Sequence, residues 1–186
     1  MLDPFRVRVD TARFRIEMRE ADRRLGTRHH RPRLAYRDVA SATNRLTLIA
    51  AMLPARCVST HTVFCLKTPL RQTAQWFLCG LFNSLVVNYL VRIWVTTHVT
   101  TSIVERLPIP GEDQAGRSFR EIARWAQALS RRDDRASWSD LNARVAELYD
   151  LNEEQFAHIL SSFPLVPRDD RDDAMRVFQR RTITPW

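Results

Sequence analysis

The sequence RQTAQWFLCGLFNSLVVNYLVRIW, from Arg71 to Trp94, has the length and apolar density of a long helix that is buried on most of its sides. Gly80, Ser84, Asn88 and Arg92 follow one another at i, i+4 spacing and therefore share one face of this predicted helix. We expect a close contact with another helix at Gly80, while Arg92 reaches solvent.

The residues before this helix favour short strands and loops. Apolar and polar residues alternate, or Val, Thr and Phe dominate, in segments that we predict as strands. These segments are Phe5–Val9, Arg13–Glu17, Leu34–Val39, Thr47–Leu53 and Cys57–Lys67. Between them, Met18–Leu25 is typical of a short charged helix that ends at Gly26, and Thr27–Arg33 is predicted to be a basic loop.

The residues after the apolar stretch favour helices. Thr96–Thr101 is β-prone, and the proline-rich segment Leu107–Gly111 marks a boundary that divides the chain into residues 1–110 and 111–186. Three helices are expected in the second region. These helices are Arg117–Leu129, one that begins at Ser137–Asp140 and one that begins at Asn152–Gln155 and ends at Phe163-Pro164. The tail from Arg168 is charged and expected to be loosely held. The predicted fold class is α+β.

Composition excludes several classes of protein. Four glycines in 186 residues cannot form a glycine-rich phosphate loop, so a self-contained nucleotide-binding or cofactor-binding enzyme is nearly excluded. Three cysteines without paired spacing argue against a secreted disulfide framework. The first thirty residues carry no apolar signal segment, and polar residues interrupt the apolar stretch Trp76–Val95. We therefore expect a cytoplasmic protein with no membrane span.

The positive charge is unevenly distributed. The net charge is +8, and the basic residues are arginines except for Lys67. Residues 1–60 contain 13 arginines and six acidic residues, whereas residues 111–186 contain 12 arginines and 14 acidic residues. A codon bias towards arginine is the simpler explanation of the ratio of arginine to lysine. The asymmetry still predicts a polyanionic partner on the N-terminal side of the molecule.

The cysteines offer one possible metal site. Cys57, His61 and Cys65 are four residues apart, which is compatible with metal ligands on one strand face, but no fourth ligand lies nearby in sequence. Buried free cysteines are common in protein cores. We therefore assign no metal ligand from the sequence.

Asn142–Leu151 and Asn152–Leu160 have the outline of a helix-turn-helix motif. Only Arg144 is basic between Ser137 and Phe163, against five acidic residues, so phosphate would repel this pair and we interpret it as a packing element. No nucleophile elbow is present, and Lys67 has no acidic neighbour in sequence. We assign no catalytic residue and no cofactor to this chain.

The most basic segment lies before the strand predicted at Leu34–Val39. Arg28, His29, His30, Arg31 and Arg33 lead directly into Tyr36-Arg37-Asp38. Arginines interleaved with aromatic residues suit a surface that holds phosphate and contacts bases. The alternative is a solvated arginine-rich face. On the DNA-binding interpretation, the Gly80–Arg92 face could also lie beside DNA or a partner domain.

Several segments together resemble the C-terminal target-recognition region of adenine-specific DNA methyltransferases of type II restriction-modification systems. These include fused type IIG enzymes with a TaqI-like specificity domain. The segments are, in chain order, Leu34–Ala40, Thr43–Pro54, His61-Thr62, Leu81–Ser84 with Tyr89 and Arg92, Thr97–Thr100, Leu107–Pro110, Leu148–Leu151 and Ile159–Pro164. The resemblance extends from about Phe14 to Val166.

The resemblance implies that residues 1–110 are a target-recognition region and residues 111–186 a helical lobe. Its partners would be double-stranded DNA and a methyltransferase catalytic domain or subunit. That catalytic part would bind S-adenosylmethionine and flip the adenine, and this chain contains no Asn-Pro-Pro or Asp-Pro-Pro motif for the flipped base. We expect the chain to be the recognition part without its catalytic half.

The resemblance and the basic segment together give seven candidate DNA-binding residues. They are Arg31, Arg33, Arg37, Arg45, His61, Thr97 and His98. Of these, Arg31 and Arg33 would contact phosphate, whereas Tyr36 and Asp38 could instead hold the fold. The alternative function is a protein-interaction subunit that docks onto a separate catalytic partner with little DNA contact, motivated by the apolar helix and the acidic tail.

Overall fold

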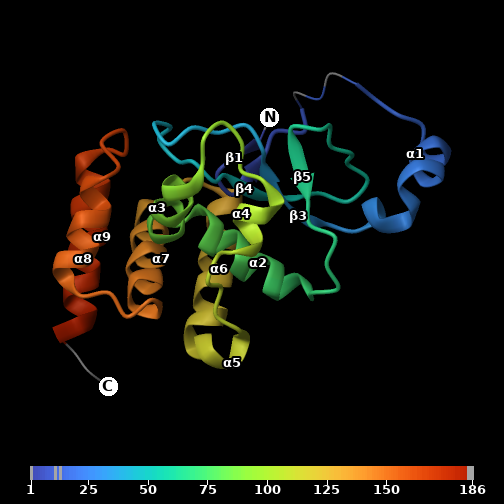
Figure 1. Cartoon of the computed structure of the whole chain (residues 1–186). Helices are drawn as coiled ribbons and strands as arrows, with labels where there is room; N and C mark the ends of the chain where they lie inside the picture. Colours follow the sequence, from blue (N-terminus) through green and yellow to red (C-terminus); the bar gives the residue numbers. More distant parts are fainter. Residues whose placement is uncertain (1, 11, 13, 184–186) are drawn as a thin grey trace.

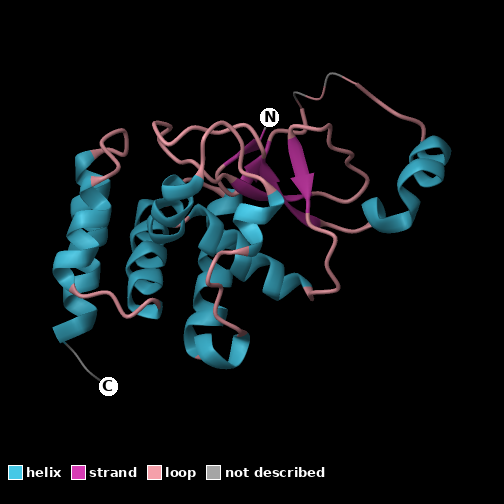
Figure 2. Ribbon diagram, viewed as in Figure 1, coloured by secondary structure: helices cyan, strands magenta, loops and turns pink. Residues whose placement is uncertain are grey.

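The computed structural model describes residues 2–10, 12 and 14–183, and its fold class is α+β, as predicted (Figures 1 and 2). Short strands and loops occupy the first third of the chain. Helices follow from residue 72 onwards and lie on one side of the strands (Figure 2). The described residues include a single core cluster that draws side chains from both predicted regions, 1–110 and 111–186.

The central sheet has three antiparallel strands in the order β4-β3-β5. β3 (Arg33–Arg37) pairs with β4 (Ala50–Leu53) on one side and with β5 (Val63–Cys65) on the other. A hairpin of β1 (Leu2–Asp3) and β2 (Arg6–Val7) joins β4 through a bridge between Phe5 and Ala51. Leu34, Ala35 and Tyr36 are almost fully buried, as expected for a central strand.

The observed strands are shorter than predicted, and the prediction of a strand at Arg13–Glu17 is wrong over residues 14–17. The N–H groups of Thr47 and Leu48 bond to the side chain of Asn88 instead of a neighbouring strand, so β4 begins only at Ala50. Residues 14–17 form no strand, and Arg13 lies outside the described residues. Thr96–Thr101 contributes only an isolated bridge between His98 and Val39 before α4 (Thr101–Glu105) begins.

The helix predicted at Met18–Leu25 is α1, with the same bounds. Gly26 ends it with φ of 63°, a left-handed value that favours glycine, and its N–H donates to the carbonyl of Asp22. The expected basic loop begins as a 3-10 helix, η1 (Gly26–His30), which directly follows α1 and brings His30 to Asp22.

The single long helix predicted at Arg71–Trp94 is wrong, because the chain bends there. α2 (Gln72–Asn83) and α3 (Leu85–Trp94) meet at an angle of 66°. Ser84 has extended backbone angles, and its hydroxyl accepts from the N–H of Val87, so it caps the start of α3. Ser84 therefore ends one helix and begins the next.

Buried asparagine side chains hold this bend to its surroundings. Asn83 accepts from the N–H of Ala50 at 3.1 Å and donates to the carbonyl of Ala50 at 2.8 Å. Asn88 accepts from the N–H groups of Thr47 and Leu48, both at 2.8 Å. Both asparagines are fully buried, so these bonds replace those that the backbone would otherwise make with water.

Helices α5 to α9 form the C-terminal lobe. They are α5 (Glu112–Ala115), α6 (Arg117–Arg131), α7 (Arg135–Leu148), α8 (Glu153–Ser161) and α9 (Arg168–Ile183). α6 packs against α2, and α7 packs between α6 and α9. The Asn142 side chain of α7 accepts from the N–H of Leu85 at 2.8 Å. α8 packs against α3 and α9 and buries Phe156, so both α7 and α8 are packing elements, as interpreted from the sequence.

Two details of this lobe correct the sequence predictions. α7 begins at Arg135, two residues before the predicted Ser137, because the carboxylate of Asp134 accepts from the N–H of Ser137 and caps the helix. The tail from Arg168 is not loose, since it forms α9, whose Ala174 and Phe178 are buried in the core. α8 begins with the predicted reciprocal cap between Asn152 and Gln155.

Gly80 makes the predicted close contact, with Ile122 of α6. Arg92 is only partly exposed, because its guanidinium is held against the protein. Its guanidinium lies over the ring of Phe163 at 3.8 Å and donates to the carbonyls of Ser162, at 2.6 Å, and Asn44. Arg92 thus joins the β3–β4 connection to the end of α8.

Within the described ranges, no single helix is long and apolar enough to cross a membrane. The bent pair α2 and α3 passes such a test of length and composition only when its two helices are taken together. Most of the residues of this pair are buried against the rest of the chain.

Replacement of Gly80 by valine should destabilise the fold by about 2–3 kcal/mol. A Cβ at Gly80 would overlap Cγ2 of Ile122 and lie 3.3 Å from the Ile122 carbonyl oxygen. Urea unfolding followed by tryptophan fluorescence measures the change. Ala157→Val, at an exposed position of α8, is the control and should cost about 0.5 kcal/mol from helix propensity alone. Equal losses in the two variants would contradict the contact.

Asn88→Leu should cost about 3 kcal/mol or more, because it leaves the N–H groups of Thr47 and Leu48 buried without an acceptor. The same unfolding measurement applies. Asn152→Ala removes an exposed amide that caps α8 and should cost only about 1 kcal/mol. A smaller loss for Asn88→Leu than for Asn152→Ala would mean that Asn88 does not hold the 47–48 segment.

Candidate nucleic-acid interface

Backbone hydrogen bonds gather three distant segments at the C-terminal end of β3. The N–H of Asp38 donates to the carbonyl of Thr62 at 3.0 Å, and the carbonyl of Asp38 accepts from the N–H of Val99 at 2.8 Å. The N–H of Ala40 donates to the carbonyl of Thr97 at 3.0 Å. Residues 37–40, 61–63 and 97–99 therefore lie side by side.

Four of the seven predicted DNA-binding residues belong to this junction. They are Arg37, His61, Thr97 and His98, and we refer to them as the β3-end cluster. The last three are exposed, and Arg37 is half-buried. The cluster offers one guanidinium, two imidazoles and one hydroxyl, all of which can donate hydrogen bonds to phosphate or to base edges.

Asp38 orients a histidine of this cluster. Its carboxylate lies 2.9 Å from Nδ1 of His98 and is only 16% exposed. This carboxylate pairs with His98 and not with Arg37, its neighbour in sequence. Arg37 forms no salt bridge with any described residue, and its Nε is buried without a partner among them. Its positive charge is therefore not neutralised at this junction.

Tyr36 holds the fold, which was one of the two roles considered for it. Its side chain is 2% exposed and stacks on the ring of Phe64, with 5.7 Å between the ring centroids. Burial, together with the nearby carboxylates of Asp38 and Glu105, raises the pKa of Tyr36 to about 12. A side chain this deeply buried cannot contact a base.

The other three predicted residues lie elsewhere. Arg33 begins β3, at the opposite end of the strand from Arg37, and its guanidinium donates to the carbonyl of Cys57 at 2.6 Å. Arg31 is exposed just after η1. Arg45 is exposed in the β3–β4 connection, where it lines an open cavity of about 910 Å³ beside the β1–β2 hairpin. The seven residues therefore do not form one continuous site.

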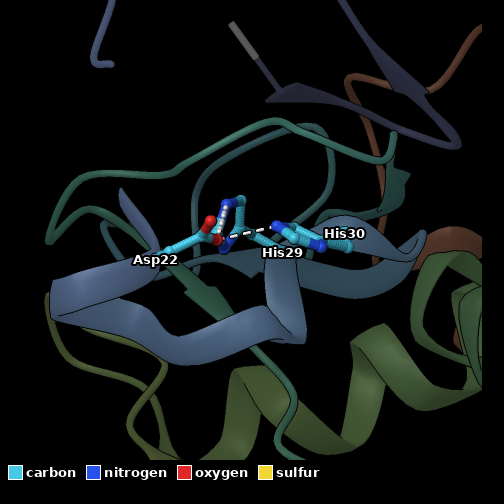
Figure 3. A group of neighbouring side chains, drawn as sticks. All are labelled: Asp22, His29 and His30. Atoms are coloured by element: carbon cyan, nitrogen blue, oxygen red, sulfur yellow. Dashed lines mark hydrogen bonds and ion pairs between the residues drawn. The ribbon is translucent and has the colours of Figure 1, made fainter. Parts of the chain in front are cut away.

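One group of potential metal ligands was not predicted from the sequence. Asp22, His29 and His30 bring three donor atoms within 4.8 Å of one another (Figure 3). The sequence signal that could have indicated this group is Gly26, which ends α1 between Asp22 and the two histidines. Across the part of the chain that the structure describes, Cys57, His61 and Cys65 do not form such a group.

Scans against protein-family models, curated proteins and solved structures found no match for this chain.

Tyr36→Phe should leave stability at neutral pH unchanged or slightly higher, because the Tyr36 hydroxyl is buried without a hydrogen-bond partner among the described residues. The substitution should change the stability at alkaline pH. The raised pKa of Tyr36 means that its contribution to stability is complete below about pH 10 and is lost as pH rises towards about 12. Thermal unfolding of the two proteins between neutral and alkaline pH measures this. A variant as alkali-sensitive as the parent would contradict the burial of this phenol.

Proposed function

We propose that this chain recognises double-stranded DNA as the target-recognition part of an adenine-specific DNA methyltransferase or a type IIG restriction-modification protein. The observation that carries the proposal is the β3-end cluster, in which three segments that the resemblance singled out converge on one exposed junction. Methyl transfer from S-adenosylmethionine would belong to a separate catalytic domain or subunit. Such a protein would act on DNA in the cytoplasm.

The distribution of charge supports the same proposal. In the C-terminal lobe, the 14 acidic residues of residues 111–186 outnumber the 12 arginines, and Arg144 and Arg181 are neutralised directly by Glu121 and Glu147. Arg28, Arg31, Arg37 and Arg45 instead form no salt bridge with a described residue. Free guanidinium groups on the N-terminal side are available for phosphate, and their counterions would be released on binding.

The resemblance and the geometry support different proposed roles for two of these arginines. Arg37 lies beside His61, Thr97 and His98, where hydrogen-bond donors of several kinds meet and base edges could be distinguished. Arg31 is exposed beside the two histidines of η1 and would contact only the phosphate backbone.

Arg37→Ala should change the sequence preference of the chain and weaken binding to its preferred duplex by about tenfold or more. Arg31→Ala should weaken binding to all duplexes equally and lower the slope of log K against log salt by about 0.9. Fluorescence anisotropy over a series of salt concentrations, after selection from random duplexes, measures both effects.

The control variant is Arg168→Ala. Arg168 is an exposed arginine of α9 that pairs with Asp172, within the acidic lobe, so its removal should leave DNA binding unchanged. Absence of duplex binding by the parent chain at low salt would overturn the proposal. Equal losses of DNA affinity in the Arg168 and Arg37 variants would mean that the β3-end cluster adds only positive charge and no specific contact.

A second candidate function is docking onto a catalytic partner with little DNA contact. The exposed apolar side chains at the end of α3 favour it, since Ile93 is 61% and Trp94 42% exposed. Stoichiometric co-purification of a partner, together with no DNA affinity in the free chain, would support this function. A monodisperse monomer that binds DNA would contradict it.

A further inference from the structure

Asp22, His29 and His30 form a compact group at the junction of α1 and η1 (Figure 3). Nε2 of His30 lies 2.7 Å from Oδ1 of Asp22, and Nε2 of His29 lies 3.3 Å from the same oxygen. Figure 3 shows both rings pointing at the carboxylate. None of these three residues belongs to the β3-end cluster, so the role of this group is independent of the proposed function.

The protonation of His29 follows from its hydrogen bond. Nδ1 of His29 lies 2.9 Å from the carbonyl oxygen of Gly26. Because a carbonyl oxygen only accepts, Nδ1 must carry the ring proton and donate it. In a neutral imidazole, Nε2 then presents a lone pair.

That lone pair has no ordinary partner. The side chain of His29 is 2% exposed, and its Nε2 is buried without a hydrogen bond to any described residue. The nearest group is the Asp22 carboxylate, which is also an acceptor. Two acceptors that face each other repel unless a proton or a metal cation lies between them. The group thus has the form of a cation site.

The donor set identifies the class of cation. Two imidazole nitrogens and one carboxylate oxygen are the ligands of zinc sites that keep an open position, and imidazole also suits nickel, cobalt and copper. The hydrogen bond from Nδ1 of His29 to a backbone carbonyl is the outer contact that orients a ligating histidine. Asp22 and His30 are 37% and 41% exposed, so water can complete the coordination.

We propose that Asp22, His29 and His30 bind a divalent transition-metal ion, with zinc the best-suited, through Oδ of the aspartate and Nε2 of each histidine. The ion would link the last turn of α1 to η1. Little else holds α1, since Ala21 is its only buried residue among those described. The carbonyl of His29 also accepts from the N–H of Arg56 at 2.6 Å, so the metal site would anchor this unit to the β4–β5 connection.

The test uses the full chain without an affinity tag, freed of metal by a chelator. Calorimetric titration with zinc chloride and metal analysis after dialysis should show one zinc per chain. Cobalt(II) should give the visible absorption of a low-coordinate site with nitrogen and oxygen ligands. His30→Gln and Asp22→Asn should each weaken zinc binding by about tenfold or more. Both side chains are partly exposed, so these variants should fold.

Two controls separate this site from other zinc ligands. His61→Gln removes an exposed histidine outside the group and should bind zinc as the parent does. The double variant Cys57→Ser/Cys65→Ser removes the two partly exposed thiols and should also retain the site. In the parent, zinc should slow trypsin cleavage after Arg23, Arg24 and Arg28, which flank the site.

Three results would overturn the proposal. One is a parent chain that retains no zinc and gives no cobalt spectrum. Another is zinc binding that survives unchanged in both His30→Gln and Asp22→Asn. The third is ring-nitrogen NMR of the zinc-treated chain that still finds a proton on Nε2 of His29, since that proton would itself pair with Asp22 and leave no ligand for a metal.

Discussion

Buried amides at the bend between α2 and α3 hold the sheet and the helices of this protein together. Asn83, Asn88 and Asn142 are fully buried, and their side chains bond to backbone groups of the β3–β4 connection, of β4 and of α3. A buried N–H without an acceptor is costly, so each amide fixes the segment that it serves. The bend therefore joins the sheet and the helical lobe into one core, with the contact between Gly80 and Ile122 beside it.

This arrangement also places the β3-end cluster. β3 is central in the sheet, so its C-terminal end is reached from both sides, by the segment before β5 and by the segment before α4. Arg92 holds the β3–β4 connection to the end of α8 through the carbonyls of Asn44 and Ser162. The exposed donors of the cluster therefore sit on a framework that is held by backbone and side-chain hydrogen bonds between distant segments.

The two candidate sites differ in how they are held. The β3-end cluster is supported by the sheet and by the core beneath it. The Asp22, His29 and His30 group lies on α1 and η1, a peripheral unit with few buried side chains (Figure 1). A metal ion adds most to the order of a segment where the protein alone holds the metal ligands weakly, because the binding energy then orders that segment. The basic residues Arg28 and Arg31 lie in and beside this unit, so its order would affect how they are presented to a polyanion.

Local sequence patterns were enough to predict the fold class, the bounds of α1 with its end at Gly26, the start of α8 at Asn152 and the uneven charge. These features depend on residues close together in the chain, through caps, periodicity and composition. The bend at Ser84, the late start of β4 and the order of the tail in α9 were settled by tertiary contacts. Tertiary contacts also settled which candidate residues meet, placing His98 on Asp38 and two histidines on Asp22. Most of those outcomes depend on hydrogen bonds and packing between segments many residues apart, which local patterns do not encode.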